Sequence, residues 1–245
     1  MKPGLMAVLA VGIASAVAAQ TVANPAAAGT AQTGAGGAAA ASGPLRVYTN
    51  PALHLTFSYP AELTPRDAST MAAAGRRMIY GSDTAADADH PQTDTCANVL
   101  LAVGEEGAAG GGAAPTWARV GLFDVDVRCL PAQALRNKKL MDVTLTNLVK
   151  QATTVMGMMP LEQPMFYEMQ GQRVHFCAAQ GTPVNMGDLQ TGEEQVAGAA
   201  AVAVNGHVLS WVMETNDSTL FNRLLGSQVD LGTGKAERLF PARVQ

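Results

Sequence analysis

The sequence predicts an α+β fold in which helices pack on the faces of an antiparallel sheet. Two kinds of pattern lead to this prediction: alternating apolar runs, typical of strands, and apolar residues three or four positions apart, typical of helices. They follow one another as two strands, a helix, two strands, a helix, four strands and a helix. Tight-turn signals such as Asn205-Gly206 join successive strands directly, which favours antiparallel pairing.

The folded part is expected to begin at Leu45 with two short strands, residues 46–48 and 53–59. The next segment, Thr64-Pro65-Arg66-Asp67, has the pattern of a capping box with proline at the first helical position. Helical spacing of apolar residues then predicts a first helix, which Gly81 should end.

A second helix is expected to begin at Pro131 and to end at Gly157 and Pro160. Its apolar residues recur in alternating steps of four and three and form one stripe, which consists of Met141, Leu145, Leu148, Ala152 and Val155. Because the lysines of this segment lie on other faces, the stripe is the side that should be buried.

Four strands are expected after this helix, at residues 165–169, 172–179, 195–204 and 207–214. Small side chains fill residues 196–204, and they would let a helix approach the backbone closely. This segment is therefore predicted to be a central strand beneath a helix.

The last two predictions for the fold concern Trp211 and the final helix. Trp211 alternates with Leu209 and Met213, so it should face the core. Asn216 or Asp217 is expected to cap the final helix.

The first nineteen residues predict export. Lys2 precedes an uncharged apolar run, residues 5–17, which is followed by small residues, and this is the pattern of a signal peptide cleaved after Ala18 or Ala19. The run is shorter than the roughly 20 apolar residues of a membrane-spanning helix, so no span is expected after cleavage. Residues 20–44, almost all Ala, Gly, Thr and Ser, are expected to form a disordered tether before a single domain at residues 45–245.

Charge argues against nucleic acid as a partner. The formal net charge is −4, and it becomes −5 once Lys2 is removed. The basic residues are scattered, and the pairs Arg76-Arg77 and Lys138-Lys139 stand apart from each other rather than forming a basic stripe.

The three cysteines of an exported chain suggest one disulfide and one thiol. Two strand-like segments, residues 97–103 and 117–127, lie on either side of the glycine-rich residues 107–114. If they pair as a hairpin centred between Gly112 and Ala113, Cys96 and Cys129 face each other at its open end. We therefore expect a Cys96–Cys129 disulfide and a buried thiol at Cys177.

Both ends of the folded part resemble PsbP-like domains. The segment YTN at 48–50 followed by LTFSYP at 55–60 is similar to the first strand of these domains, and the final helix with Phe221, Leu224 and Leu225 is similar to their last helix. The sequence departs from the family pattern at His54 and Leu63, where a glycine and a tryptophan are common. The resemblance implies an α-β-α sandwich that serves as a binding or assembly module, and it implies no catalytic residue.

A strand histidine and cysteine are one candidate for metal binding. His175 and Cys177 are two positions apart, so both project from one face of their strand. A metal site needs further ligands, and none is predicted nearby. The alternative is a histidine with a backbone partner beside a buried thiol.

Methionines are a second candidate, because thioethers favour Cu(I). Five lie close together: Met156, Met158, Met159, Met165 and Met169. The alternative is that adaptable methionine side chains fill gaps in the core, as they would elsewhere in this methionine-rich chain.

Acidic pairs are the remaining candidates for chemistry. Asp124 and Asp126 alternate on one predicted strand, and Glu193-Glu194 precede another. A general acid and base need contrasting environments, whereas a strand pair of this kind is more simply the solvated face of a sheet. The sequence has no nucleophile-elbow motif and no phosphate-binding loop.

These observations favour an exported, non-enzymatic binding or assembly module of the cell envelope, periplasmic or secreted, with no cofactor. Its partner would be a protein or a small ligand. Two alternatives stay open: a copper-handling protein that uses the methionine, histidine and cysteine residues above, and an enzyme whose site is assembled from distant segments.

Export is directly testable. Expression of the full chain in its native host should yield a protein that has lost its first 18 or 19 residues, because cleavage follows Ala18 or Ala19. The intact mass of the purified protein measures this. A mass that retains Met1 to Ala18 would contradict the export hypothesis.

Overall fold

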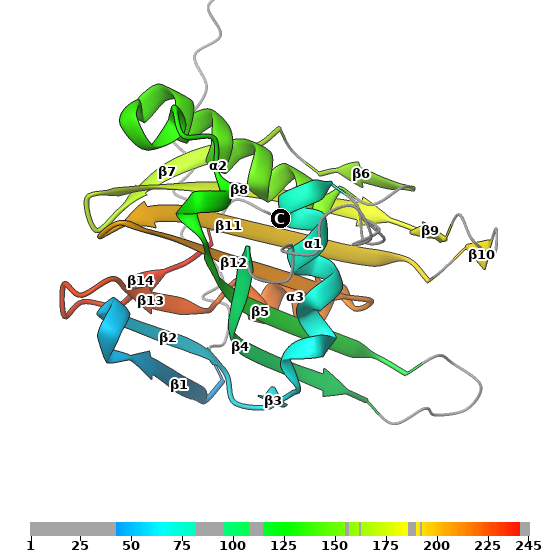
Figure 1. Cartoon of the computed structure of the whole chain (residues 1–245). Helices are drawn as coiled ribbons and strands as arrows, with labels where there is room; N and C mark the ends of the chain where they lie inside the picture. Colours follow the sequence, from blue (N-terminus) through cyan, green and yellow to red (C-terminus); the bar gives the residue numbers. More distant parts are fainter. Residues whose placement is uncertain are drawn as a thin grey trace, which may run out of the picture. The chain divides into compact units, whose positions relative to one another are not determined.

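The computed structural model describes residues 43–81, 96–107, 115–154, 157–161, 163–185, 190–191 and 193–240. These residues form an α+β fold, as predicted, and all lie in one compact unit that spans Ala39–Gln245 (Figure 1). The predicted signal peptide and nearly all of the predicted tether lie outside the described residues. In the described part, no helix is both long enough and apolar enough to span a membrane.

Eight antiparallel strands form the main sheet, in the order β3-β4-β5-β12-β11-β8-β6, with β7 also paired to β8. Their bounds are β3 Thr64–Pro65, β4 Ala97–Glu106, β5 Trp117–Val125, β6 Met158–Pro160, β7 Met165–Met169, β8 Gln172–Gly181, β11 Gln195–Val204 and β12 His207–Thr215.

A second antiparallel sheet has the order β1-β2-β13-β14, and a third consists of two short strands. The second sheet comprises β1 Leu45–Asn50, β2 Leu55–Pro60, β13 Gln228–Asp230 and β14 Glu237–Arg238; the third comprises β9 Val184–Asn185 and β10 Gln190–Thr191. The helices are α1 Ala72–Tyr80, α2 Lys138–Thr153 and α3 Ser218–Leu224, with 3-10 turns at Pro51–Leu53, Ala68–Met71, Val127–Cys129 and Ala134–Arg136.

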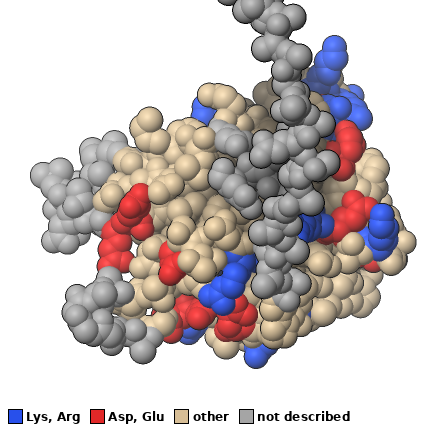
Figure 2. Space-filling model, turned by 180° about the vertical axis from the view of Figure 1, so that it is seen from behind, with Lys and Arg blue, Asp and Glu red and all other residues tan. Residues whose placement is uncertain are grey.

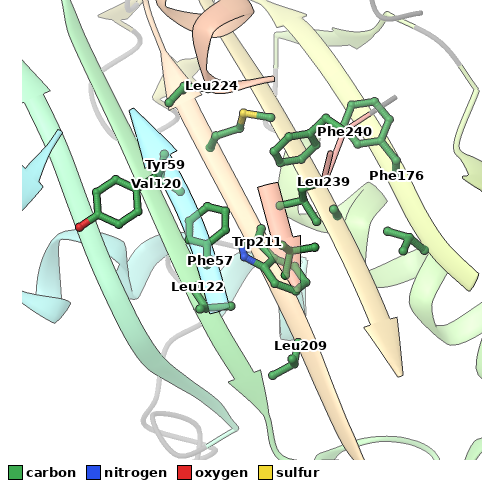
Figure 3. Packing of buried hydrophobic residues seen from close by; sticks show 14 of the residues in the cluster. Phe57, Tyr59, Val120, Leu122, Phe176, Leu209, Trp211, Leu224, Leu239 and Phe240 are labelled. Carbon is green, nitrogen blue, oxygen red and sulfur yellow. The ribbon is translucent and has the colours of Figure 1, made fainter. Parts of the chain in front are cut away.

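The main sheet is covered on both faces. Helices α1 and α2 bury one face, and α3 with the second sheet buries the other, so adjacent strand residues belong to different hydrophobic clusters. Trp211 is fully buried on the second-sheet side beside Phe57 and Leu122, which confirms that it faces the core (Figure 3). Its neighbour Val212 points to the helical side.

The small-sided strand is central, as predicted. β11 lies between β12 and β8, and α2 packs against it. Ala199 and Ala201 face α2, whereas Ala200 and Val202 face the opposite cluster. Because these side chains end at Cβ or shortly beyond it, they leave room for the helix to lie close to the sheet.

The start of α2 differs from the prediction. The helix begins at Lys138 rather than at Pro131, because Asn137 is its cap: the Asn137 side chain accepts hydrogen bonds from the backbone N–H groups of Lys139 and Leu140 at 3.0 and 3.4 Å. The buried stripe is confirmed for Leu145, Leu148 and Ala152, with Met141 half-buried. Val155 lies outside the described residues, and the helix ends at Thr153, before Gly157.

The predicted capping box ahead of α1 is wrong. Thr64 and Pro65 pair with β4, where the Thr64 hydroxyl donates to the Gly104 carbonyl at 3.1 Å. These residues therefore form the edge strand β3 of the main sheet instead of the first turn of a helix. Asp67 caps a 3-10 turn, and α1 follows from Ala72. Gly81 ends α1 as predicted, with a φ of +73° that suits glycine.

The predicted disulfide is confirmed: Cys96 and Cys129 are bonded, with Cα atoms 5.8 Å apart. Closing a loop of this length stabilises the fold by about 3–4 kcal/mol on the chain-entropy model. The predicted pairing of the hairpin is two to three residues out of register, because Ala97 lies opposite Val125 and Leu101 opposite Leu122. A bulge between Val99 and Leu101, and a 3-10 turn that carries Cys129, account for the difference.

Two tight turns share one backbone pattern. Asn205 and Gly206 have φ angles of +52° and +82°, which confirms the hairpin between β11 and β12. Gln170 and Gly171 have φ angles of +52° and +73° at the turn between β7 and β8. The final helix is capped by Asp217, one of the two predicted residues.

Strands β13 and β14 were not predicted, and a glutamine holds their hairpin in place. The Gln170 amide donates to the carbonyls of Val229 and Lys235, both at 2.8 Å, and its oxygen accepts from the Leu231 N–H at 2.8 Å. The β7–β8 turn of the main sheet is thereby tied to the second sheet.

A buried ion pair joins α1 to the main sheet. The Arg77 guanidinium bonds the Glu214 carboxylate on β12, and its Nε donates to the Ala152 carbonyl near the end of α2 at 3.0 Å. Arg77 is 6% exposed. One side chain therefore links three elements on the helical side of the sheet.

Replacing Arg77 should destabilise the fold strongly. Arg77→Met leaves the Glu214 carboxylate largely buried without its cation, which costs about 3–5 kcal/mol. Urea unfolding measures the change, and the double variant Arg77→Met, Glu214→Gln should recover part of it. Arg128→Ala, which breaks an exposed ion pair with Asp126, is the control and should have little effect. Equal effects of the two arginine substitutions would contradict the structural role of Arg77.

Candidate functional site

Exposed apolar side chains gather where α2 lies beside β7. The large apolar residues exposed in the described part are Val47, Leu135, Leu140, Val143, Met159, Leu161 and Phe166. Leu135, Leu140 and Val143 belong to α2 or the turn before it, and Phe166 belongs to β7. We call Leu135, Val143 and Phe166, which line the two hollows described below, together with the polar groups between them, the α2–β7 surface.

Local structure explains why these residues face outward. The buried stripe of α2 faces β11 and β8, so Leu140 and Val143 lie on other sides of the helix. On β7, Phe166 and Glu168 share one face because they are two positions apart. The strand pairing places Phe166 opposite His175 and Glu168 opposite Arg173.

An ion-paired cluster lies between α2 and the two strands. The Asp142 carboxylate accepts from the Arg173 guanidinium at 2.8 Å through one oxygen and lies 3.3 Å from His175 Nε2 through the other. The Thr146 hydroxyl lies 3.0 Å from His175 Nδ1. Arg173 also stacks over the Phe166 ring, 4.4 Å from its centroid, and so connects the polar cluster to the exposed aromatic side chain.

His175 is buried and favours the neutral form. Burial lowers the pKa of His175, and the hydrogen bond to Asp142 opposes this effect without overcoming it. A neutral imidazole that donates from Nε2 to Asp142 has a lone pair on Nδ1, which can accept the Thr146 proton. The same hydroxyl lies 2.8 Å from the Asp142 backbone carbonyl, so its single proton is shared between two acceptors.

Two hollows flank the cluster and share Asp142 and Arg173 as walls. One, of about 230 Å³, is lined by Val143, Thr146, Asn147, Phe166 and His175 in addition. The other, of about 380 Å³, lies at the start of α2, where Leu135, Arg136 and Lys138 meet Glu168 and the β7–β8 turn. The smaller hollow lies below the usual size of a ligand pocket, about 300–1,000 Å³, and suits a single side chain.

The cluster has the residue types of a nucleophile, base and acid, but its bonding indicates a structural role. Thr146 is bonded to its own helix backbone, and Asp142 is held by Arg173 as well as by His175. Burial, rather than a neighbouring charge, is the main cause of the lowered pKa of His175. The arrangement therefore supports α2 on β8 and presents Arg173 and Phe166 to the outside.

The proposed metal ligands do not converge in the described residues. His175 and Cys177 do share the α2 face of β8, but His175 is bonded to Asp142 and Thr146, and burial raises the pKa of Cys177. Met158 is buried, Met159 is 71% exposed, and Met156 lies outside the described residues. Among the residues that the structure describes, no three His, Cys, Asp or Glu side chains are placed to hold a metal ion.

The remaining methionines of that group, Met165 and Met169, pack in or against the main hydrophobic cluster. Their positions agree with the interpretation that methionine fills gaps in the core.

The acidic candidates are engaged in local contacts. Asp124 lies 3.2 Å from His207, and Asp126 caps the 3-10 turn that carries Cys129. Glu193 accepts from Asn216 at 2.9 Å, and Glu194 accepts from Gln180 at 2.7 Å. These pairs lie at the surface, and on the face shown in Figure 2 acidic and basic residues are interspersed rather than gathered by sign.

Asp142, Thr146, Phe166 and Arg173 did not emerge as candidates from the sequence. Their local signals are weak: Asp142 and Thr146 are four positions apart on a helix, and Phe166 and Arg173 lie on two strands of a hairpin. Only the packing of that hairpin under α2 brings them together.

Comparisons with known proteins give no family. No family model matches the chain, and no curated protein matches it. Among solved structures, the chain is similar to a Pseudomonas aeruginosa protein described as "Protein of Unknown Function PA94" and "Putative Regulator". The two are 9% identical, with a TM-score of 0.29, over 74% of this chain and 88% of the other. A likeness this small carries no inference about function, and the resemblance to PsbP-like domains stays a prediction.

Acidification should destabilise the fold through His175. Its pKa in the folded protein lies below the ordinary value of 6.5, so at mildly acidic pH the unfolded chain binds a proton that the folded protein does not. Stability should therefore decrease as the pH falls below about 6.5, until the folded pKa is reached. Urea unfolding at several pH values measures this dependence, and His175→Gln should reduce it. An unchanged dependence in that variant would contradict the assignment.

Proposed function

We propose that the protein is an exported, non-enzymatic binding or assembly module of the cell envelope that contacts its partner through the α2–β7 surface. The observation that carries the proposal is the exposure of Leu135, Val143 and Phe166 around a rigid, ion-paired cluster. Exposed apolar groups gathered on one surface are typical of interaction sites.

Rigidity supports this use of the surface. The apolar residues are carried by a capped helix of 16 residues and by a strand paired along its length with β8. Arg173 is held from two sides, by Asp142 and by the Phe166 ring. A surface that is ordered before binding loses little conformational entropy when a partner binds.

Export is supported by two independent features. The first residues have the pattern of a signal peptide, and the Cys96–Cys129 disulfide is typical of proteins in oxidising compartments. The resemblance to PsbP-like domains favours the same class of function, because it implies a binding or assembly module. The metal and enzyme alternatives receive no comparable support from the contacts of their candidate residues.

Site-specific photo-cross-linking in the native host tests this proposal. A photoreactive amino acid in place of Phe166, which is 58% exposed, should give a discrete cross-linked product. The matched control replaces Val47, which is 62% exposed on β1, and should give none. The same products from both positions, or no product from Phe166, would contradict the proposal.

A further inference from the structure

Resting on the proposed function, we propose that the partner contributes an extended segment, acidic and apolar, which adds to the outer edge of β7. Three properties of the α2–β7 surface lead to this inference: the pairing of β7, the position of the two hollows, and the charge on α2.

The outer edge of β7 is available for pairing. Residues 165–169 pair with residues 172–176 of β8, and β7 has no other strand partner in the part of the chain that the structure describes. β7 therefore lies at the end of the main sheet beside α2 (Figure 1). A strand with one unpaired edge presents backbone N–H and C=O groups to an extended peptide, which is a common mode of peptide recognition.

The side chains of such a peptide would reach the two hollows. A strand added to β7 directs alternate side chains to the face that carries α2, Phe166 and Glu168. Phe166 lines the hollow of about 230 Å³, and Glu168 lines the hollow of about 380 Å³. Two peptide residues, two positions apart, would thus lie beside different hollows.

The lining of the smaller hollow favours an apolar residue. Val143 and Phe166 form its exposed walls, and the polar groups at its base, Asp142 and His175, are bonded to each other. A small apolar side chain fills such a space without leaving a protein hydrogen bond unmade.

Charge complementarity favours an acidic residue at the larger hollow. Arg136 and Lys138 line it, and Lys139 and Lys150 are further exposed cations of α2. None of these four has a carboxylate partner among the described residues, whereas the two acidic residues that line this hollow, Asp142 and Glu168, both pair with Arg173. The exposed side of α2 is thus basic in a chain whose net charge is −4. Opposite charge on the partner would favour association and fix its orientation.

A synthetic peptide tests these features separately. The probe is a fluorescein-labelled, threonine-rich peptide. It carries one leucine and, two positions later, one aspartate, so that in an extended strand both side chains project from the same face. Its binding to the full disulfide-bonded protein is measured by fluorescence anisotropy. Replacing the aspartate by lysine should weaken binding about tenfold or more, because like charges then meet. Methylating the backbone nitrogens that face β7 should also weaken it about tenfold or more, because the strand hydrogen bonds are lost.

Protein variants locate the binding site. Phe166→Ser should weaken binding by removing one wall of the smaller hollow, and Arg136→Glu with Lys138→Glu should weaken the aspartate peptide while improving the lysine peptide. Val47→Ser, on the exposed strand β1, is the matched control and should bind as the unmodified protein does. The methylated peptide tests strand addition on the unmodified protein, so a variant that fails to fold leaves the inference testable.

Three results would overturn the inference. They are equal binding of the aspartate and lysine peptides, undiminished binding of the methylated peptide, and binding to phosphatidylglycerol vesicles in the absence of any binding to the peptide. Each leaves the proposed function standing if cross-linking at Phe166 succeeds, because that experiment does not depend on the chemistry of the partner. Failure of the cross-link would instead contradict the proposed function.

Discussion

The close approach of α2 to the central strand β11 is the constraint on which the rest of the helical side depends. Ala199 and Ala201 point at the helix and are fully buried, so the helix lies on a nearly flat strip of sheet. Larger side chains at these positions would overpack a filled interior. The position of α2 in turn sets the place of α1, because Arg77 of α1 bonds the Ala152 carbonyl near the end of α2.

The same constraint assembles the candidate site. Asp142 and Thr146 lie on the side of α2 that overhangs β8, and the strand presents His175 and Arg173 to them. Burial of a histidine is unfavourable to its charged form, and the hydrogen bonds of this cluster compensate for the loss of water. The polar cluster thus fixes the edge of the sheet to the helix, and Phe166 and Val143 are left exposed above it. Stability and the proposed binding surface come from one arrangement.

The local signals of the sequence predicted much of the fold. Asn205-Gly206 formed a hairpin because two consecutive residues with positive φ match the twist of paired strands. The Cys96–Cys129 pairing followed from the placement of two strands around a glycine-rich segment. The two errors have different causes: Thr64 pairs with β4, a tertiary contact, instead of capping a helix, whereas α2 starts at a second local cap, Asn137, instead of at Pro131.

The sequence by itself determined the α+β class, the central small-sided strand and the core position of Trp211, because each depends on periodic burial, and it determined the disulfide because a glycine-rich segment marks the turn of the hairpin that joins the two cysteines. Tertiary structure alone decided the short strands β13 and β14, which have three and two residues and exist only through pairing and the Gln170 contacts. It also decided the candidate site. Asp142 and His175 are 33 positions apart, and no local pattern specifies which helix face meets which strand edge. The contact between α2 and β8 depends on how the helices pack across the whole sheet.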